Sequence, residues 1–484
     1  MKVTRRSFLT KAALATATFS FSARSWSQVP GANSDVRMAT VGFKGRGGDH
    51  ISNLSKAKGV RYTALCDADQ DVLRGGAAKL SKDGPQVETY VDVRKLLENK
   101  NVDAVTIATP NHWHSLGAIW AIQAGKDVYV EKPVSHNVWE GRKVVEAARA
   151  HGKIVQTGTQ SRSQPAIRDA MAYIHGGELG KVKLVRGLCY KRRASIGKVD
   201  GPQPIPAEIN YDLWCGPAPM DPLMRAKLHY DWHWVWPTGN GDLGNQGIHQ
   251  MDIGRWALGV NELSPRVWSL GGRFGYIDDG TTPNTQIVFH DYAKAPFIFE
   301  VRGLPSGPVP AGQKEVMDKY KGADVGVIVE CENGYVVFTQ NYGTVKAFDK
   351  NDQMVREFKG GANHYENFLT AVRSRRHTDL NADILEGHLS SALCHTGNIS
   401  YQLGKPASQK ELESKVKSDK DAQESFGRML EHLKINQVDL QKTKATLGPI
   451  LTMDPKTEKF KGNRDANALL TRNYRKPYVI NDTV

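Results

Sequence analysis

Two short stretches of the chain carry residue types that suit redox chemistry. Gly42-Phe43-Lys44-Gly45-Arg46-Gly47 follows the largely apolar run 36–41, and Glu131-Lys132-Pro133 follows the run 128–130. A glycine turn between a strand and a helix lets backbone N–H groups approach a pyrophosphate at the helix N-terminus. Hydride removal from a carbinol also needs a base for the hydroxyl proton, and a lysine with a lowered pKa can accept it. Together the stretches predict a dinucleotide with a proton-handling lysine beside it.

Each of these two stretches also has an ordinary structural explanation. The glycine spacing GxxGxG is looser than the usual GxGxxG, and glycine-rich turns are common in loops. Lys132 after a strand is equally compatible with a solvated surface lysine. Their positions at the carboxyl ends of predicted strands favour the functional interpretation, with Gly42, Gly45 and Gly47 against the cofactor and Lys132 in catalysis.

Asp67 follows the second predicted strand, 60–66. An acidic residue there accepts hydrogen bonds from the adenosine ribose hydroxyls and disfavours a 2′-phosphate, so we expect NAD in preference to NADP. The alternative is that Asp67 caps a helix over 69–80. Arg46 keeps NADP open, because an arginine near this position can reach a phosphate.

The segment Thr109-Pro110-Asn111-His112-Trp113-His114 follows the third predicted strand, at the same sheet edge. Proline and asparagine begin helices well, so capping alone could explain part of it. We expect Thr109, Asn111 and His114 to lie at the nicotinamide end of the cofactor, together with Glu131. Histidines at i and i+2 do not share a helix face, so no metal site is expected.

A third candidate region is Gly239-Asn240-Gly241-Asp242-Leu243-Gly244-Asn245-Gln246-Gly247-Ile248-His249-Gln250-Met251-Asp252. Asn245, His249 and Asp252 stand at i, i+4 and i+7 of a helix predicted over 242–258, and so share one face. A helical histidine is often a core residue, but three polar residues after a glycine-rich entry favour an active site. His249 would donate or accept a proton, Asn245 would orient a hydroxyl, and Asp252 would contact substrate.

The run 229–236 is rich in aromatic residues and includes Trp232 and Trp234. Such residues suit the C–H faces of sugar rings, and they equally suit a domain core. Lys191-Arg192-Arg193 could bind an acidic substituent or form a solvated loop.

The elements that must position these residues fall into two domains. Short apolar runs at 36–41, 60–66, 102–108, 127–130 and 154–156 alternate with helical stretches, which predicts a doubly wound parallel sheet over 36–158. Successive strands then predict an α+β domain with an antiparallel or mixed sheet over 159–404. The extension 405–484 is polar, with one helix predicted over 421–434.

The first 27 residues read as an export signal. Thr4-Arg5-Arg6-Ser7-Phe8-Leu9 is a twin-arginine pattern, and the uncharged stretch 12–23 is shorter than the roughly 20 residues that span a bilayer. We expect the protein to be exported folded to the periplasm or beyond, without a membrane anchor.

Composition excludes several other function classes. The leader holds five of the fourteen net positive charges, and the remaining charges of both signs are interspersed, which does not indicate nucleic-acid binding. The five cysteines are widely spaced without a CxxC pair, which argues against a disulfide framework and a zinc cluster.

Five features follow one another along the chain: the glycine turn at 42–47, Asp67, and the segments 109–114, 131–133 and 239–252. With these features in this order, residues 36–404 resemble the Gfo/Idh/MocA family, which includes glucose–fructose oxidoreductase and inositol dehydrogenase. The resemblance implies a Rossmann domain, a C-terminal domain with a large open mixed sheet, and homodimers or tetramers formed through that sheet. It also implies NAD(P)-dependent chemistry on sugars or cyclitols, with Lys132 as the catalytic lysine and His249 as its proton-transfer partner. Many members have Asp where this chain has Asn245, and an amide cannot act as a base or balance a lysine's charge.

Three functions remain compatible with the sequence. The first is an oxidoreductase with a tightly held nicotinamide cofactor acting on a carbohydrate or cyclitol hydroxyl or ketone. The second is glycoside cleavage through transient oxidation and elimination, with no net change in the cofactor. The third is a carbohydrate-binding protein without turnover, which the replacement of Asp by Asn245 keeps open.

Overall fold

The computed structural model describes residues 35–82, 86–308 and 313–484. The expected twin-arginine leader, residues 1–27, lies outside the described residues. Within the part that is described, no helix combines the length and the apolar composition needed to cross a membrane.

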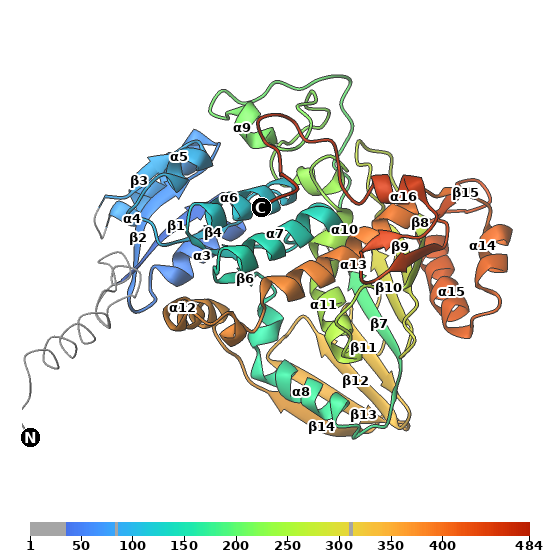
Figure 1. Cartoon of the computed structure of the whole chain (residues 1–484). Helices are drawn as coiled ribbons and strands as arrows, with labels where there is room; N and C mark the ends of the chain where they lie inside the picture. Colours follow the sequence, from blue (N-terminus) through green and yellow to red (C-terminus); the bar gives the residue numbers. More distant parts are fainter. Residues whose placement is uncertain (1–34, 83–85, 309–312) are drawn as a thin grey trace, which may run out of the picture.

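The N-terminal domain is the predicted doubly wound parallel sheet, with strand order β3-β2-β1-β4-β5-β6 (Figure 1). The strand order reverses between β1 and β4, and such a reversal places a ligand crevice at the carboxyl ends of the strands. The elements are β1 (Val36–Val41), α3 (Arg46–Leu54), β2 (Val60–Cys66), α4 (Gln70–Ser81), β3 (Glu88–Tyr90), α5 (Val93–Leu97), β4 (Ala104–Ile107), α6 (Asn111–Gln123), β5 (Asp127–Val130), α7 (Val138–Ala150) and β6 (Val155–Thr157).

Helices cover both faces of this sheet, which is why β4 and β5 are buried along their whole length. On one face Leu116 and Val144 of α6 and α7 belong to one apolar cluster with the central strands. On the other face Leu54 of α3 packs with Phe368 of α12 (His364–Ser374). The chain therefore returns to its first sheet after passing through the second domain, and Figure 1 shows α12 beside α3.

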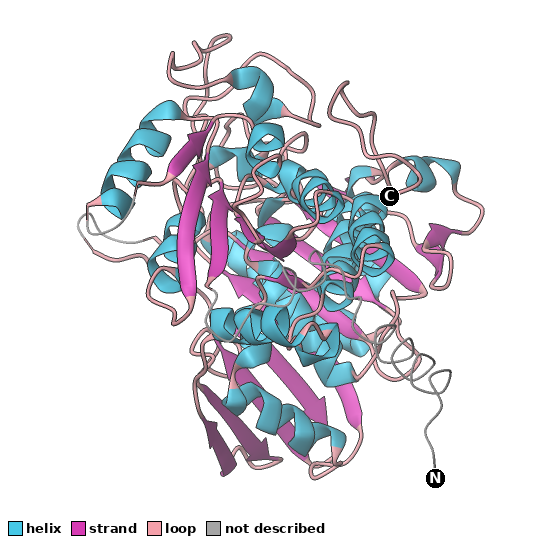
Figure 2. Cartoon of the chain, turned by 60° about the vertical axis from the view of Figure 1, so that its left-hand side comes forward, coloured by secondary structure: helices cyan, strands magenta, loops and turns pink. Residues whose placement is uncertain are grey.

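The second domain is built on a 12-stranded mixed sheet, whose main path is β14-β13-β12-β11-β7-β10-β9-β8-β16-β15. Strands β7 and β10 run parallel, whereas β10–β9, β9–β8 and β7–β11–β12 are antiparallel. Both predicted sheets are therefore confirmed, and Figure 2 shows their strands with the helices packed against them. The strands are β7 (Val182–Tyr190), β8 (Arg266–Gly272), β9 (Thr285–His290), β10 (Phe297–Arg302), β11 (Val325–Cys331), β12 (Gly334–Thr339), β13 (Thr344–Asp349), β14 (Met354–Lys359), β15 (Lys405–Ala407), β16 (Ala445–Leu447), β17 (Leu451–Asp454) and β18 (Lys459–Phe460).

The helix predicted over 242–258 is interrupted, and forms α10 (Gly241–Asn245) and α11 (Gly247–Leu258). The break is a tight packing point, since a Cβ at Gly247 would lie 3.1 Å from the Asp242 carbonyl oxygen and 3.1 Å from the Phe299 ring. The other helices of this part are α8 (Pro165–His175), α9 (Tyr211–Cys215), α13 (Ile384–Gln402), α14 (Gln409–Val416), α15 (Lys420–Ile435) and α16 (Arg464–Ala468), with 3-10 turns at Gln160–Ser163, Asp231–Trp234 and His377–Asp379.

Residues 405–484 are more structured than the single expected helix. Strands β15 and β16 extend the second sheet, while α14 and α15 cover part of its outer face. Leu412 and Phe426 from these helices pack with Leu184, Leu270 and Ile298 of the sheet. Part of the sheet face through which the family resemblance implies oligomers is therefore covered by the chain itself.

Candidate active site

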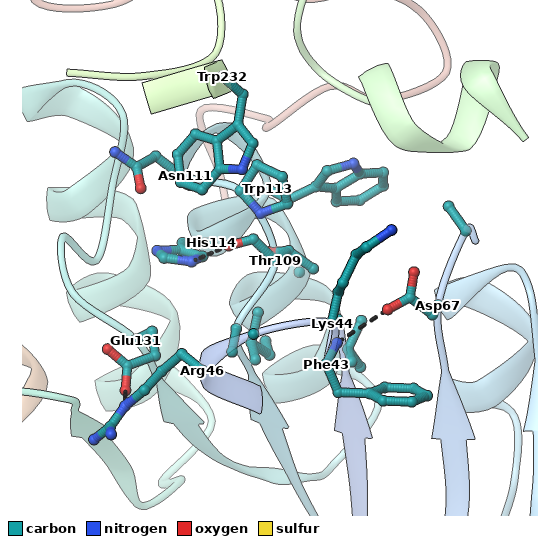
Figure 3. Close-up of a pocket in the computed structure, with 18 of the residues that line it drawn as sticks. Phe43, Lys44, Arg46, Asp67, Thr109, Asn111, Trp113, His114, Glu131 and Trp232 are labelled. Carbon is teal, nitrogen blue, oxygen red and sulfur yellow. Dashed lines mark hydrogen bonds and ion pairs between the residues drawn. The ribbon is translucent and has the colours of Figure 1, made fainter. Parts of the chain in front are cut away.

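A pocket of about 620 Å³ lies between the carboxyl edge of the first sheet and the α10–α11 segment of the second domain. The loops after β1, β2, β4 and β5 form one wall, and Asn245, His249 and parts of residues 213–233 form the other. Figure 3 shows the first-domain side, where Asp67 follows β2, Thr109 and His114 follow β4, and Glu131 follows β5.

The glycine turn after β1 is close-packed against its surroundings. Gly42 has φ of +74°, and a Cβ there would lie 2.8 Å from the Cα of Thr109. A Cβ at Gly47 would lie 2.1 Å from the Gly42 carbonyl oxygen. Gly45 is the N-cap of α3 and has open space where a Cβ would stand. No side chain forms a capping hydrogen bond with the first N–H groups of this helix. The first N–H groups of α3 are therefore available to an anion such as a pyrophosphate.

Asp67 does not cap the following helix. Its Oδ2 accepts a hydrogen bond from the Phe43 backbone N–H at 3.0 Å and its Oδ1 one from the Asp69 N–H at 3.0 Å. Asp69 is the cap of α4, accepting from the N–H groups of Asp71 and Val72. Burial raises the pKa of Asp67 to about 6. The Asp67 carboxylate thus faces the pocket beside the glycine turn, where it can meet ribose hydroxyls (Figure 3).

Arg46 turns away from Asp67 and towards Glu131. Its Nε donates to Glu131 Oε1 at 3.0 Å, and its Nη1 lies 3.2 Å from Asp49. His50 Nε2 lies 2.9 Å from the same Glu131 oxygen. Burial alone would raise the pKa of Glu131. The hydrogen bond with His50 and the charge of Arg46 outweigh burial and hold this pKa well below its usual range. Arg46 is therefore already paired with carboxylates, which weakens its candidacy as a 2′-phosphate ligand.

The segment after β4 joins several parts of the site. Thr109 lines the pocket, and its buried Oγ1 has no hydrogen-bond partner. The Asn111 amide donates to Asn240 Oδ1 at 2.9 Å, which connects the two domains. His114 lies between the carbonyl oxygens of Pro133, at 2.6 Å, and Thr109, at 2.8 Å. The loops after β4 and β5 are thereby held together at the pocket.

Lys132 reaches across from the first domain to the second. Its Nζ donates to the backbone carbonyl of Asn245 at 3.0 Å and lies 3.4 Å from the Asn245 amide oxygen. Burial lowers the pKa of Lys132. The Glu131 charge opposes this shift, and the nearby cationic groups of Arg46, Lys191 and Arg193 add to it. The neutral amine is the form that can accept a proton, so this environment favours a basic role.

His249 lines the same pocket on α11. Its Nδ1 is buried without a hydrogen-bond partner. Burial, followed by the positive charge of Lys132, lowers the pKa of His249 to about 3. The imidazole is therefore neutral near pH 7, so it can exchange hydrogen bonds with a hydroxyl.

Two family models match parts of the chain. Residues 36–159 match the GFO_IDH_MocA model, described as an oxidoreductase family with an NAD-binding Rossmann fold. Residues 179–273 match the C-terminal alpha/beta domain model of the same family. The chain is therefore similar to the Gfo/Idh/MocA oxidoreductase family over residues 36–159 and 179–273. Its first domain is an NAD-binding Rossmann domain, and the uncapped α3, the unpartnered Thr109 hydroxyl and the Asp67 carboxylate fit such a cofactor.

Curated relatives match only part of the chain. Inositol 2-dehydrogenase 1 of Saccharopolyspora erythraea is 34% identical over 33% of this chain and 46% of its own length. A Glycosyl hydrolase family 109 protein of Solibacter usitatus is 36% identical over 25% of this chain and 30% of its own length. The matches thus span less than half of these relatives.

The fold of this chain is also seen in solved structures. The WlbA dehydrogenase from Bordetella pertussis, solved in complex with NADH and UDP-GlcNAcA, superposes with a TM-score of 0.53. The match covers 74% of this chain and 94% of that one at 18% identity, which supports the shared fold.

Two of the predicted substrate contacts require correction. Trp232 lines the pocket and stacks on His233, with ring centroids 3.5 Å apart. Trp234 lies outside the pocket lining, buried under the Arg193 guanidinium. Asp252 is fully buried in an ion pair with Arg162 at 2.8 Å. Asn245 and His249 both line the pocket, whereas Asp252, on α11 like His249, is directed to the buried Arg162.

The sequence reasoning also missed part of the pocket wall. Leu213 and Trp214 line it from α9, and His229 from a following loop, where its Nε2 lies 3.0 Å from Asp69. Leu213 and Trp214 belong to a proline- and glycine-rich connection without hydrophobic periodicity, whereas His229 begins the aromatic run 229–236. The only signal was the clustering of aromatic residues within it.

Proposed function

We propose that this protein oxidises a hydroxyl or reduces a ketone of a carbohydrate or cyclitol, with tightly held NAD. The observation that carries the proposal is the Lys132 Nζ contact with Asn245, within the pocket that also contains the glycine turn and Asp67. A proton acceptor therefore lies in the same pocket as the cofactor groups. The inositol dehydrogenase relative supports a polyhydroxylated substrate.

The residues divide the work as follows. A nicotinamide dinucleotide, when bound, supplies the hydride acceptor or donor. Lys132 takes the hydroxyl proton during oxidation and returns it during reduction, because its lowered pKa makes the neutral amine accessible. His249 hydrogen-bonds the reacting oxygen as a neutral imidazole. Asn245 holds the Lys132 ammonium through its backbone carbonyl and cannot itself carry the proton.

Trp232 supplies the flat surface that a sugar or cyclitol ring requires. Its indole is partly exposed at the pocket and supported from behind by His233. Aromatic faces bind the C–H faces of such rings. The polar edge of the ring would then meet Lys132 and His249.

The test begins with the cofactor. Protein purified natively would be denatured and its supernatant analysed by mass spectrometry for nicotinamide dinucleotides. The loaded protein would then be mixed with cyclitols, hexoses and their keto derivatives while nicotinamide absorbance is followed. A stoichiometric cofactor and a net redox change in one substrate class are the expected results. Folded protein that neither contains nor takes up the cofactor would instead favour a carbohydrate-binding role.

A second candidate is glycoside cleavage through transient oxidation, favoured by the match to a Glycosyl hydrolase family 109 protein. Oxidation of a hydroxyl would acidify a neighbouring C–H, and elimination would expel the leaving group. Water would add to the resulting enone, and return of the hydride to the ketone would regenerate the hydroxyl and the oxidised cofactor. Lys132 and His249 could serve both courses. Release of an aglycone from a chromogenic glycoside without net cofactor reduction would select this candidate.

We also propose that the protein is exported folded by the twin-arginine route and forms homo-oligomers. The pattern Arg5-Arg6 supports export. The test is to fractionate cells that express the protein with both arginines changed to lysine, which should keep it in the cytoplasm. Oligomers would have to avoid the sheet surface covered by α14 and α15, and light scattering after size-exclusion chromatography would measure their mass.

A further inference from the structure

A segment of the second domain forms a wall of the cofactor pocket. Residues 209–216, the wall segment, include α9 and lie in the connection between β7 and α10. Ile209 forms a β-bridge with Asp69, and the Asn210 N–H donates to the Ala68 carbonyl at 2.9 Å. Leu213 and Trp214 face the pocket. The wall segment thus closes the crevice directly beside Asp67, at the end where the adenosine would lie.

The wall segment also packs against α6 of the first domain through Trp113. The Trp113 indole N–H donates to the Leu213 carbonyl at 2.9 Å. Gly216 has φ of +49°, and a Cβ there would lie 2.2 Å from the Trp113 ring. Trp113 itself lines the pocket. The wall segment cannot move outward without breaking this contact.

The C-terminal end of the chain passes behind the wall segment. Residues 471–480, the C-terminal strap, continue from α16, run past α9 and end beside α6 (Figure 1). Tyr478 OH donates to Asp212 Oδ2 at 2.6 Å, and the Arg475 guanidinium pairs with the same carboxylate. Arg475 also donates to the carbonyl oxygens of Asp212, at 2.7 Å, and Gly216, at 3.1 Å.

The same strap is fastened to the first domain. The Tyr478 ring is 1% exposed and meets Trp113 edge to face, with centroids 5.5 Å apart. Arg472 donates to Glu140 and to the His112 carbonyl, each at 3.0 Å, and Tyr474 OH donates to Glu140 at 3.0 Å. The strap therefore connects α6 and α7 with the wall segment.

We propose that the C-terminal strap clamps the wall segment over the bound dinucleotide and so retains the cofactor through repeated turnovers. The inference rests on the proposed function, because it requires a bound nicotinamide dinucleotide. Asp212 is the positioning residue, since it receives both Arg475 and Tyr478 while its neighbours Leu213 and Trp214 line the pocket. A protein that works where free NAD is scarce would need such retention.

The test measures cofactor exchange in the full chain. Protein loaded with NAD would be freed of excess, mixed with isotopically labelled NAD, and sampled by mass spectrometry over time. The double variant Arg475→Gln/Tyr478→Phe removes both side-chain donors from Asp212 while keeping the buried ring. We expect it to exchange at least about tenfold faster than the unaltered protein, because charge-assisted hydrogen bonds to the wall segment are lost. Arg464→Gln, an exposed charge-matched control in α16, should leave the rate unchanged.

Two further measurements keep the outcome decisive. Arg475→Lys should keep part of the slow cofactor exchange that the double variant loses. Hydrogen exchange at the backbone amides of Asn210 and Trp214 should be faster in the double variant but unchanged in Arg464→Gln. Equal exchange rates in the double variant and the control would overturn the clamp while leaving the proposed function intact. Rapid exchange in the unaltered protein would also overturn it. Folded protein that takes up no nicotinamide dinucleotide would contradict the proposed function itself.

Discussion

The ammonium group of Lys132 lies 3.0 Å from the backbone carbonyl oxygen of Asn245. Since the two residues belong to different domains, the packing between the domains determines where the proton acceptor stands. Neither oxygen that Asn245 offers to this lysine carries a formal charge. The Asn245 contact therefore holds the lysine without adding a second carboxylate to Glu131, whose charge opposes the lowering of the Lys132 pKa.

Lys132→Met should abolish turnover while leaving the cofactor bound. The substitution keeps most of the side-chain length but removes the proton acceptor, so we expect kcat to fall by about 10²–10⁴-fold. Thermal stability should be maintained or rise, because a buried cationic group with a lowered pKa is removed. Steady-state kinetics, thermal denaturation and mass spectrometry of the released cofactor would measure these effects. Unchanged kcat would remove Lys132 from the mechanism.

Asn245→Asp should move the pH dependence of oxidation to higher pH. Oxidation requires the neutral amine, so its rate rises as pH increases through the pKa of Lys132. A carboxylate at 3–4 Å would stabilise the ammonium form and raise that pKa by about one to three units. Profiles of kcat against pH would show the shift.

Gln246→Glu is a suitable control for this substitution. It adds the same charge one residue away, where the native side chain accepts a hydrogen bond from Lys191 at 2.7 Å. Its effect on the pH profile should be smaller than that of Asn245→Asp. Equal shifts in the two variants would show that the Asn245 contact has no specific influence on Lys132.

The sequence predicted the frame of the molecule well, because long elements have strong local signals. Strands β1, β2 and β5 have the predicted bounds, and β6 is shifted by one residue. The three-residue strands β15 and β16 were missed, because they are too short for a periodic pattern and their pairing partners are distant in sequence. The cover that α14 and α15 provide for the sheet is likewise a tertiary contact.

The same contrast holds for the candidate site. Gly42, Asp67 and Lys132 were recognised because each follows a predicted strand at one sheet edge. Asp252 was misplaced because its partners, Arg162 and Ser390, are distant in sequence and no local pattern reveals them. Trp214 was missed because its position depends on contacts with Trp113 and His112 that no local pattern reveals.

Asp67→Asn should relax the preference for NAD over NADP. Near pH 7 the Asp67 carboxyl, with a pKa of about 6, is mostly ionised and repels a 2′-phosphate. Loss of the charge should reduce the ratio of the two cofactor affinities by about tenfold or more. In the unaltered protein the ratio should also fall as pH drops below about 6, because Asp67 becomes protonated. Asp67→Asn should lack the part of this fall that comes from Asp67, so the variant also controls for titration of the 2′-phosphate. Calorimetric titration with NAD and with NADP would measure the affinity ratio in both proteins.

The stability of the cofactor-free protein gives an independent check on Asp67. The pKa of Asp67 in the fold, about 6, lies above its ordinary value of 3.8, so the folded state binds this proton more tightly than the unfolded chain. The Asp67 contribution therefore lowers stability as pH rises through that interval. Asp67→Asn should make the cofactor-free protein more stable near pH 7, by on the order of 1 kcal/mol, with little difference near pH 4. Denaturant unfolding at the two pH values would test this, and a variant that is less stable near pH 7 would contradict it.

Asp252 and His249 lie three residues apart on α11, but we expect substitution of Asp252 to lower stability and substitution of His249 to lower turnover. Asp252→Asn weakens the acceptor set of a buried guanidinium, since Asp252 pairs with Arg162 at 2.8 Å and accepts from Ser390 at 2.7 Å. We expect a loss of about 3 kcal/mol of unfolding free energy, with kcat within a few-fold of normal in the protein that remains folded. His249→Asn removes an imidazole from the pocket, so turnover should fall by about a hundredfold or more while stability changes little. Denaturant unfolding and kinetics measured on both variants would separate the roles, and a large selective loss of kcat in Asp252→Asn would return Asp252 to the substrate site.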